Sequence, residues 1–203
     1  MKSVVVKEGD SVTLDSGLTE LKDDDLIQWR FGNTLIAEIN VTADSFSVYD
    51  DVLDGRFRDR LKLDNQTGSL TITDTRPEHT GIYVLNIFNM STFFILAVYD
   101  KETSVNEGDS VTLYSGLTEI MDDDEIHWMF ENTVIAEINK RVGSFTVYNG
   151  VLGGRFRDRL KLDHQTGSLT ITNTRPEHAG GYLLVIESIK NLLKAFRVAV
   201  NGE

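Results

Sequence analysis

The sequence predicts an all-β chain of two tandem β-sandwiches, and three observations lead to this fold class. About 59 of the 85 positions from Val4 to Phe88 are identical to the residue 99 places further on. Within each copy, short segments rich in β-branched and aromatic residues alternate apolar and polar positions, as half-buried strands do. Almost no segment shows helical periodicity. Because about 100 residues is the size of one whole sandwich, each copy is expected to bury its own core.

The repeat also sets the domain boundaries. The match between the copies runs from Glu8 to Ile87 without a gap. We predict one domain at residues 1–99 and a second at residues 100–203. The junction contains no Gly, Ser or Pro tract, so we expect a short connection with a limited hinge.

The strands of the first copy are predicted from the alternation and from the turn residues between them. They are expected at residues 12–16, 26–31, 35–39, 46–49, 60–63, 69–73, 82–88 and 93–99. Asn65-Gln66-Thr67-Gly68 is predicted to be a tight turn, in which Gly68 can take a positive φ. Pro77 suits the first position of one short helical turn.

Composition restricts the classes of function. The 203 residues carry a formal charge of −12, which argues against a nucleic-acid partner, because such proteins cluster Lys and Arg against phosphate. No apolar run reaches the roughly 18 to 20 residues that span a bilayer, and the N-terminus lacks signal-peptide features. We therefore expect a trimmed extracellular region, attached to a membrane only through an anchor outside this chain. The absence of cysteine fits either redox compartment.

No group of residues indicates catalysis, a metal or a cofactor. Asp23-Asp24-Asp25 and Asp122-Asp123-Asp124 lack the ligand spacing and the Gly of a calcium loop, so we predict solvated loops, with a weak cation site or a partner contact as alternatives. The four histidines, His79, His127, His164 and His178, have no zinc-ligand spacing. No nucleophile motif or phosphate-binding loop is present. An enzyme is therefore the least supported class.

The order of landmarks along each copy resembles the V-set immunoglobulin pattern. Ser16 ends a Val-Thr-Leu strand, Trp29 follows thirteen residues later, and Gly81-Ile82-Tyr83 comes after a Ser-Leu-Thr-Ile-Thr strand. The second copy repeats these landmarks, with Trp128 and Tyr182 at the matching places. The resemblance implies Greek-key, V-like sandwiches with a buried Trp and a tyrosine corner, in which the Tyr hydroxyl bonds to the main chain.

Two departures from that pattern occur in both copies. The positions of the usual disulfide hold Ser16 and Leu85 in the first copy, and Ser115 and Leu184 in the second. Packing of Trp and Leu is expected to offset the roughly 2 to 5 kcal/mol that a lost bridge costs. The Asp of the strand F motif is replaced by His79 and His178. This replacement puts in doubt the ion pairs that the family pattern gives to Arg60 and Arg159.

The missing disulfide, together with Gly55-Arg56-Phe57 and Arg60, resembles the membrane-distal domain of the SLAM (signalling lymphocyte activation molecule) family of leukocyte receptors. In that family a C2-type domain with disulfides usually follows, whereas a second cysteine-free copy stands here. The resemblance implies an adhesion or immune receptor that binds through the sheet of strands G, F, C and C′. The implied partner is another immunoglobulin domain, in homophilic or heterophilic binding, and a homodimer is possible.

Strand alternation predicts which side chains this sheet exposes. With Trp29, Leu35, Ala37, Ile39 and Leu85 inward, the outward residues of the first copy are Gln28, Arg30, Ile36, Glu38, Val84, Asn86 and Phe88. The matching residues of the second copy are His127, Met129, Ile135, Glu137, Leu183 and Val185. The second face is the more apolar one, so the copies are not expected to share a ligand equally.

Three N-glycosylation acceptor triplets begin at Asn40, Asn65 and Asn89, and all lie in the first copy. The second copy has His164 where the first has Asn65. The second F to G connection is three residues longer than the first, which is a further difference beside the predicted face. A structural spacer, an adhesin repeat and a secreted decoy remain as alternatives to an adhesion receptor.

Overall fold

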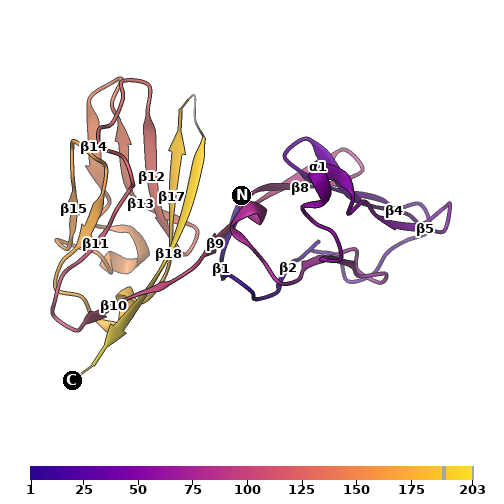
Figure 1. Cartoon of the computed structure of the whole chain (residues 1–203), viewed down its shortest axis with the longest axis horizontal. Helices are drawn as coiled ribbons and strands as arrows, with labels where there is room; N and C mark the ends of the chain where they lie inside the picture. The colour runs from indigo at the N-terminus through magenta and orange to yellow at the C-terminus, as the bar shows by residue number, and fades with distance from the viewer. Residues whose placement is uncertain (189–190, 203) are drawn as a thin grey trace. The chain divides into compact units, whose positions relative to one another are not determined.

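The chain forms two compact units, Met1–Asp100 and Lys101–Glu203. The computed structural model describes residues 1–188 and 191–202, so part of the longer F to G connection lies outside the described residues. Each unit is a sandwich of a six-stranded sheet and a three-stranded sheet (Figure 1). The all-β, two-sandwich fold class is confirmed.

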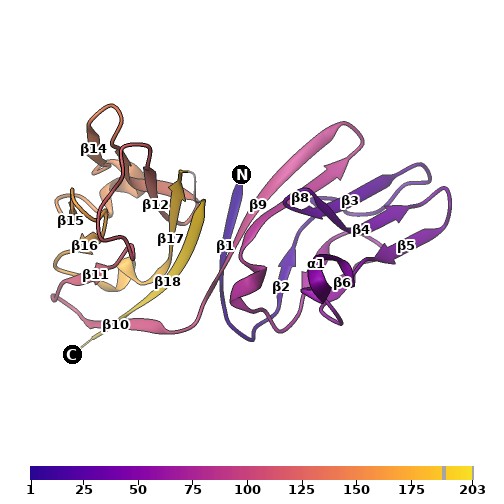
Figure 2. The ribbon, with the colours of Figure 1, turned by 45° about the horizontal axis from the view of Figure 1, so that its top comes forward.

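The six-stranded sheet of the first unit has the order β1-β9-β8-β3-β4-β5. These strands are β1 (Lys2–Lys7), β9 (Met90–Tyr99), β8 (Gly81–Ile87), β3 (Leu26–Phe31), β4 (Thr34–Asn40) and β5 (Ser45–Val48). In immunoglobulin lettering they are A′, G, F, C, C′ and C″. β1 runs parallel to β9, and the other pairs are antiparallel (Figure 2). The opposing sheet is β2 (Val12–Leu14), β7 (Leu70–Ile72) and β6 (Leu61–Leu63).

The second unit repeats this topology. Its larger sheet is β10 (Glu102–Asn106), β18 (Leu192–Asn201), β17 (Gly180–Glu187), β12 (Glu125–Phe130), β13 (Thr133–Asn139) and β14 (Ser144–Val147). Its smaller sheet is β11 (Val111–Leu113), β16 (Leu169–Ile171) and β15 (Leu160–Leu162). Each unit has its own cluster of buried apolar side chains.

A buried tryptophan organises each core. The Trp29 indole N–H donates to the Gly68 carbonyl at 2.8 Å, and Trp128 makes the same bond to Gly167 at 2.9 Å. Leu85 lies opposite Trp29 in the sheet and is buried. Leu85 therefore adds apolar packing at one of the two disulfide positions of the family pattern, while at the other the Ser16 hydroxyl donates to the Thr67 carbonyl at 2.6 Å. Trp29 and Trp128 are core residues as predicted.

The turn between strands E and F contains a buried, hydrogen-bonded histidine in both units. η1 (Pro77–His79) and η3 (Pro176–His178) are short 3₁₀ turns, where the sequence predicts one around Pro77. The Tyr83 hydroxyl donates to the His79 carbonyl at 2.7 Å, which confirms the tyrosine corner. His79 Nδ1 accepts the Arg76 N–H at 2.9 Å, and Nε2 lies 2.8 Å from the Arg56 carbonyl oxygen. The second unit repeats these three contacts.

The connection from strand C″ to strand D contains a turn that the sequence does not predict. α1 (Val52–Gly55) holds Leu53 and Asp54 at φ +54° and +58°. η2 (Val151–Gly154) is its counterpart, with Leu152 at φ +52° and a glycine, Gly153, after it. A left-handed Leu is costly, and no apolar alternation marks it in the sequence.

Candidate protein-binding face

The outer face of the first larger sheet brings polar residues from three strands into one row. Gln28 on β3 lies between Glu38 on β4 and Asn86 on β8. The Gln28 amide donates to the Glu38 carboxylate at 2.8 Å, and the Asn86 amide donates to the Ser91 hydroxyl at 2.7 Å. These bonds fix the side chains in one layer.

Arg30 forms the next row, opposite Val84. Its guanidinium donates to two neutral oxygens, the Gln28 side-chain carbonyl at 3.3 Å and the Asn33 main-chain carbonyl at 3.4 Å. Neither bond neutralises its charge. An arginine held in this way offers donors to a carboxylate on a partner at little further cost in side-chain entropy.

The prediction that Ile36 lies on this outer face is wrong. Trp29 pairs with Ala37, but Arg30 pairs with Leu35, so Ile36 is an extra residue in a β-bulge. A bulge shifts the alternation by one residue. Ile36 is therefore fully buried, and Leu35, which was predicted to point inward, takes the outer position beside Arg30. Ile135 is buried by the same bulge in the second unit.

The F to G end of this face is apolar and exposed. The exposed fractions are 62% for Phe88 and 43% for Phe93, whereas the exposed Met90 pairs with Ile87 and therefore lies on the other side of the sheet. Phe93 lies opposite Val84, which links these side chains to the Arg30 row. Phe88 has φ +52° and lies in the turn after β8, beyond the end of the strand. The face therefore combines one arginine, a row of amides and an aromatic edge.

The corresponding face of the second unit has different chemistry. His127 lies between Glu137 and Val185, with its Nε2 atom 3.6 Å from the Glu137 carboxylate. The Tyr148 hydroxyl is 3.4 Å from the same carboxylate, and partial burial together with this negative charge raises the pKa of Tyr148. Met129 takes the place of Arg30. This face therefore presents no arginine at its centre.

The predicted exposure of Leu183 on this second face is also wrong. It was predicted to be exposed, yet only 2% of its surface is accessible. The register keeps it on the outer side of the sheet, between Met129 on β12 and Ala195 on β18. Leu183 is in the central strand, where apolar neighbours flank it on both sides. Alternation predicts the side of the sheet but not the accessible area.

The predicted glycosylation sites all lie at turns or strand ends of the first unit. Asn65 and Asn89 are exposed, whereas Asn40 is half-buried at the end of β4. The Asn40 side-chain oxygen accepts the Ala43 N–H at 3.1 Å. Asn89 adjoins Phe88 and Met90, so a sugar there would lie beside the apolar edge of the face.

The aspartate clusters are only partly the solvated loops that were predicted. Asp25 is buried, and its carboxylate accepts the Lys22 N–H at 2.7 Å. Asp124 does the same for Met121 at 2.8 Å. The third aspartate of each cluster thus closes the turn before strand C. Among residues 1–188 and 191–202, no group of His, Asp and Glu side chains has the arrangement of a metal site.

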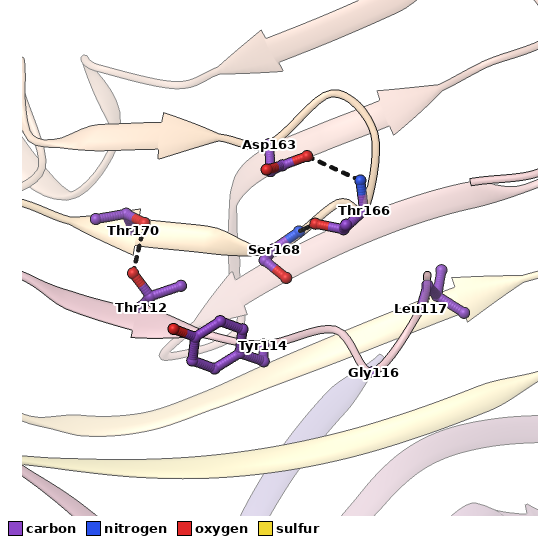
Figure 3. A pocket seen from close by; sticks show the side chains of 8 residues that line it. All are labelled: Thr112, Tyr114, Gly116, Leu117, Asp163, Thr166, Ser168 and Thr170. Atoms are coloured by element: carbon purple, nitrogen blue, oxygen red, sulfur yellow. Dashed lines mark hydrogen bonds between the residues drawn. The ribbon is translucent and has the colours of Figure 1, made fainter. Parts of the chain in front are cut away.

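A shallow hollow on the smaller sheet of the second unit is lined by hydroxyl groups (Figure 3). The Thr112 and Thr170 hydroxyls bond to each other at 2.8 Å, and Tyr114 is exposed at its rim. The first copy has Asp15 in place of Tyr114. The two threonine hydroxyls are already paired with each other, so the hollow has the character of an ordinary strand surface.

The topology and the exposed larger sheets define a pair of tandem immunoglobulin-like domains. Residues 1–96 match the family model of the immunoglobulin V-set domain, a class of recognition domains that are not enzymes. No protein among the curated sequences matches the chain. No helix of the described residues is both long and apolar enough to cross a membrane.

Several solved structures are similar to parts or most of this chain. The first Ig-like domain of human CD48 antigen has 20% identity and a TM-score of 0.41, and the match covers 49% of this chain and 83% of that one. The CD2-binding domain of CD58 has 12% identity and a TM-score of 0.40, covering 98% and 97%. Murine CEACAM1b has 18% identity and a TM-score of 0.35, covering 97% and 96%. All three TM-scores are below 0.5, so these similarities support no conclusion about the fold or role of this chain.

Proposed function

We propose that this chain is the extracellular recognition or adhesion module of an immune-type cell-surface receptor, and that it binds itself or a related immunoglobulin domain through the outer face of strands G, F, C and C′. The observation that carries this proposal is Arg30. Its guanidinium is bonded to neutral oxygens on an open sheet, and the exposed Phe93 lies in the same row, two strands away. The V-set match of residues 1–96 and the resemblance to the SLAM family support the same class of function.

The proposed face has the composition of a small, reversible interface. Aromatic residues and arginine account for most binding hot spots, and polar rims supply register. Phe88 and Phe93 provide the apolar area, while Gln28, Asn86 and Glu38 provide donors and acceptors. We propose that Asn40, Asn65 and Asn89 carry N-linked glycans on this extracellular domain.

The charges on this face are complementary to themselves in a two-fold dimer. In a two-fold dimer the same patch meets itself, so Arg30 of one copy can face Glu38 of the other. The two residues lie in adjacent rows on neighbouring strands. An ion pair between them would also locally offset the repulsion between two chains of charge −12.

The test is binding by purified full-length chain and by Arg30→Glu and Phe88→Ala variants. Each substitution removes a contact of the proposed face and leaves the core intact, so binding should weaken at least tenfold, which corresponds to about 1.4 kcal/mol. Lys62→Glu is the matched control, because Lys62 is an exposed cation on the other sheet. If both face variants self-associate and bind immunoglobulin-domain partners like the wild type, the proposed face is wrong.

The double variant Arg30→Glu with Glu38→Arg separates homophilic from heterophilic binding. It exchanges the charges, so a self-associating chain should regain binding that Arg30→Glu alone has lost. A heterophilic partner keeps its own charges and should bind the double variant poorly. Sedimentation and cell aggregation measure the first case, and surface binding to candidate partner domains measures the second.

A further inference from the structure

The two units differ at one place on the edge of the larger sheet. In the second unit, Phe145 on β14 stacks on His164 with ring centroids 4.2 Å apart and planes at 19°. His164 lies in the turn between β15 and β16, and Phe145 packs against the core. The first unit has Phe46 and Asn65 at these positions. Phe46 therefore has no imidazole ring from the turn to stack on.

The turn itself is the same in both units. The Asp64 carboxylate accepts the N–H groups of Gln66 at 2.7 Å and Thr67 at 3.0 Å. Asp163 accepts the N–H of Gln165 at 2.8 Å in the same way. It also accepts the N–H of Thr166 at 2.9 Å (Figure 3). In both turns the bonds from these backbone N–H groups lower the carboxyl pKa. Because the turns match, the Asn65 side chain leaves the backbone where the His164 side chain does.

Phe46 is exposed to a degree that its counterpart is not. It has 39% of its surface accessible, whereas Phe145 is half-buried. Val48, on the same strand, is also exposed, while the matching Val147 packs against the second core. The C″ strand of the first unit thus shows apolar surface beside an exposed asparagine in the sequence Asn65-Gln66-Thr67.

We propose that Asn65 carries an N-linked oligosaccharide whose first N-acetylglucosamine lies on the ring of Phe46, in the place that the His164 ring takes on Phe145. The inference rests on the proposed function, because it requires passage through the secretory pathway. The asparagine side chain is shorter than histidine, and its amide nitrogen ends near the start of the space that the imidazole fills. A sugar attached there extends over the phenylalanine, with its C–H groups toward the ring.

The modification is a glycosyl transfer from a lipid-linked oligosaccharide pyrophosphate. The Asn65 side-chain nitrogen attacks the anomeric carbon of the first sugar and forms the C–N bond. The bond from that carbon to the phosphate oxygen breaks, and the lipid pyrophosphate leaves with the electron pair. The nitrogen loses one proton to the transferase base, so no oxidant or reductant is needed.

The experiment uses the full chain secreted from eukaryotic cells, with glycopeptide mass spectrometry for occupancy and amide hydrogen exchange for the stability of Ser45–Val48. The variants are Asn65→Gln, Phe46→Ala and their combination, with Asn89→Gln as the control for loss of a glycan elsewhere. We expect occupied Asn65 and roughly 3- to 10-fold faster exchange of Ser45–Val48 in Asn65→Gln. Phe46→Ala should have that effect only when the glycan is present.

Two exchanges between the units sharpen the test. Asn65→His should restore slow exchange without a sugar, because it recreates the stack of the second unit. His164→Asn creates Asn-Gln-Thr in the second unit, and the new site should be glycosylated and should keep the β14 amides protected.

The outcomes separate this inference from the proposed function. Occupied Asn40 or Asn89 with an empty Asn65 would overturn the inference and leave the extracellular function standing. An occupied Asn65 with equal effects of Phe46→Ala in both backgrounds would overturn the stacking. A secreted chain with no sugar at any of the three sites would contradict both the inference and the glycosylation proposed for the domain.

Discussion

The two units of this chain have nearly the same interior but different outer faces. Trp29 and Trp128 make the same bond to a glycine carbonyl, and Tyr83 and Tyr182 close the same corner. On the larger sheet, however, Arg30 is exchanged for Met129 and Asn86 for Val185. The interior residues pack and hydrogen-bond to form the sandwich core, so either unit tolerates only small changes there. The face positions are free of that constraint, and their differences are therefore the best guide to binding.

The edge of the larger sheet also differs. Phe145 and Val147 of β14 pack against the second core, whereas Phe46 and Val48 of β5 are exposed. Side chains at matched positions of the same fold thus have different accessible areas, and for the phenylalanine one cause is that the His164 ring covers Phe145.

The largest expected effect tests whether the two interiors are equivalent. Trp29→Ala and Trp128→Ala each remove a fully buried indole and its hydrogen bond, so each should destabilise its own unit by about 3 to 5 kcal/mol. Amide hydrogen exchange resolved by peptide reports each unit separately. The two losses should agree within about 1 kcal/mol. A much smaller loss in one unit would contradict the equivalence of the cores.

The next effect tests the bulge in strand C′. Ile36 is fully buried and Leu35 lies on the outer face. Ile36→Ala should therefore cost about 2 to 5 kcal/mol, and Leu35→Ala should stay within about 1 kcal/mol. Urea unfolding of both variants measures the difference. Leu35→Ala serves as the control for loss of an aliphatic side chain on the same strand. Equal losses would show that the strand has no bulge in solution.

The bulge also marks the limit of what the sequence predicts. The repeat, the tryptophans and the tyrosine corner follow from spacing and residue type, because burial of a large aromatic residue has a strong pattern. Alternation places Gln28, Arg30 and Glu38 on one side of the sheet. It fails at Leu35 and Ile36, since the extra residue of the bulge reverses the alternation on one side of it, and such an insertion leaves no signal in apolar content. Comparison of the two copies does not reveal the bulge either, because both have isoleucine at the bulged position, Ile36 and Ile135.

Other features escape prediction for different physical reasons. Leu183 has the correct side but the wrong exposure, because accessible area depends on neighbours from strands that are distant in sequence. Asp25 and Asp124 read as surface charge until the turn that folds back on their carboxylates is known. Leu53 takes a left-handed conformation that its residue type disfavours. Residue type alone could not have indicated it.

The free energy of unfolding should depend on pH in the same way in both units, because the buried histidines are equivalent. Burial lowers the pKa of His79 and of His178, although each Nε2 atom bonds to an arginine carbonyl. The unfolded chain therefore takes up these protons at a higher pH than the folded chain. The histidines therefore do not reduce the free energy of unfolding above about pH 6.5. Below that pH the free energy of unfolding falls toward the folded pKa, by at most about 1.4 kcal/mol per pH unit for each histidine.

Urea unfolding at pH 7.5 and pH 5 measures this loss of stability. His79→Asn supplies the control, because its side-chain oxygen can accept the Arg76 N–H as the imidazole Nδ1 atom does. That variant should remove the part of the dependence that belongs to the first unit and leave the part that belongs to the second. An unchanged dependence in the first unit would mean that carboxylates cause it instead.

The smallest expected effect concerns an ion pair that only one unit has. Arg60 lies 3.0 Å from the Asp74 carboxylate, while Arg159 meets Asn173 at the matching place. Both arginines also donate to the main-chain carbonyl of that residue, and Asp74 and Asn173 share a left-handed φ of +49° and +48°. The difference between Asp74 and Asn173 therefore changes the charge without changing the backbone.

Asp74→Asn should lower the free energy of unfolding by about 0.2 to 1 kcal/mol, and Asn173→Asp should raise it by as much, because the pair is partly exposed. Both effects should shrink in 1 M salt, where charges are screened within about 3 Å. A loss that is unaffected by salt would assign the stability to the carbonyl bonds that the two units share.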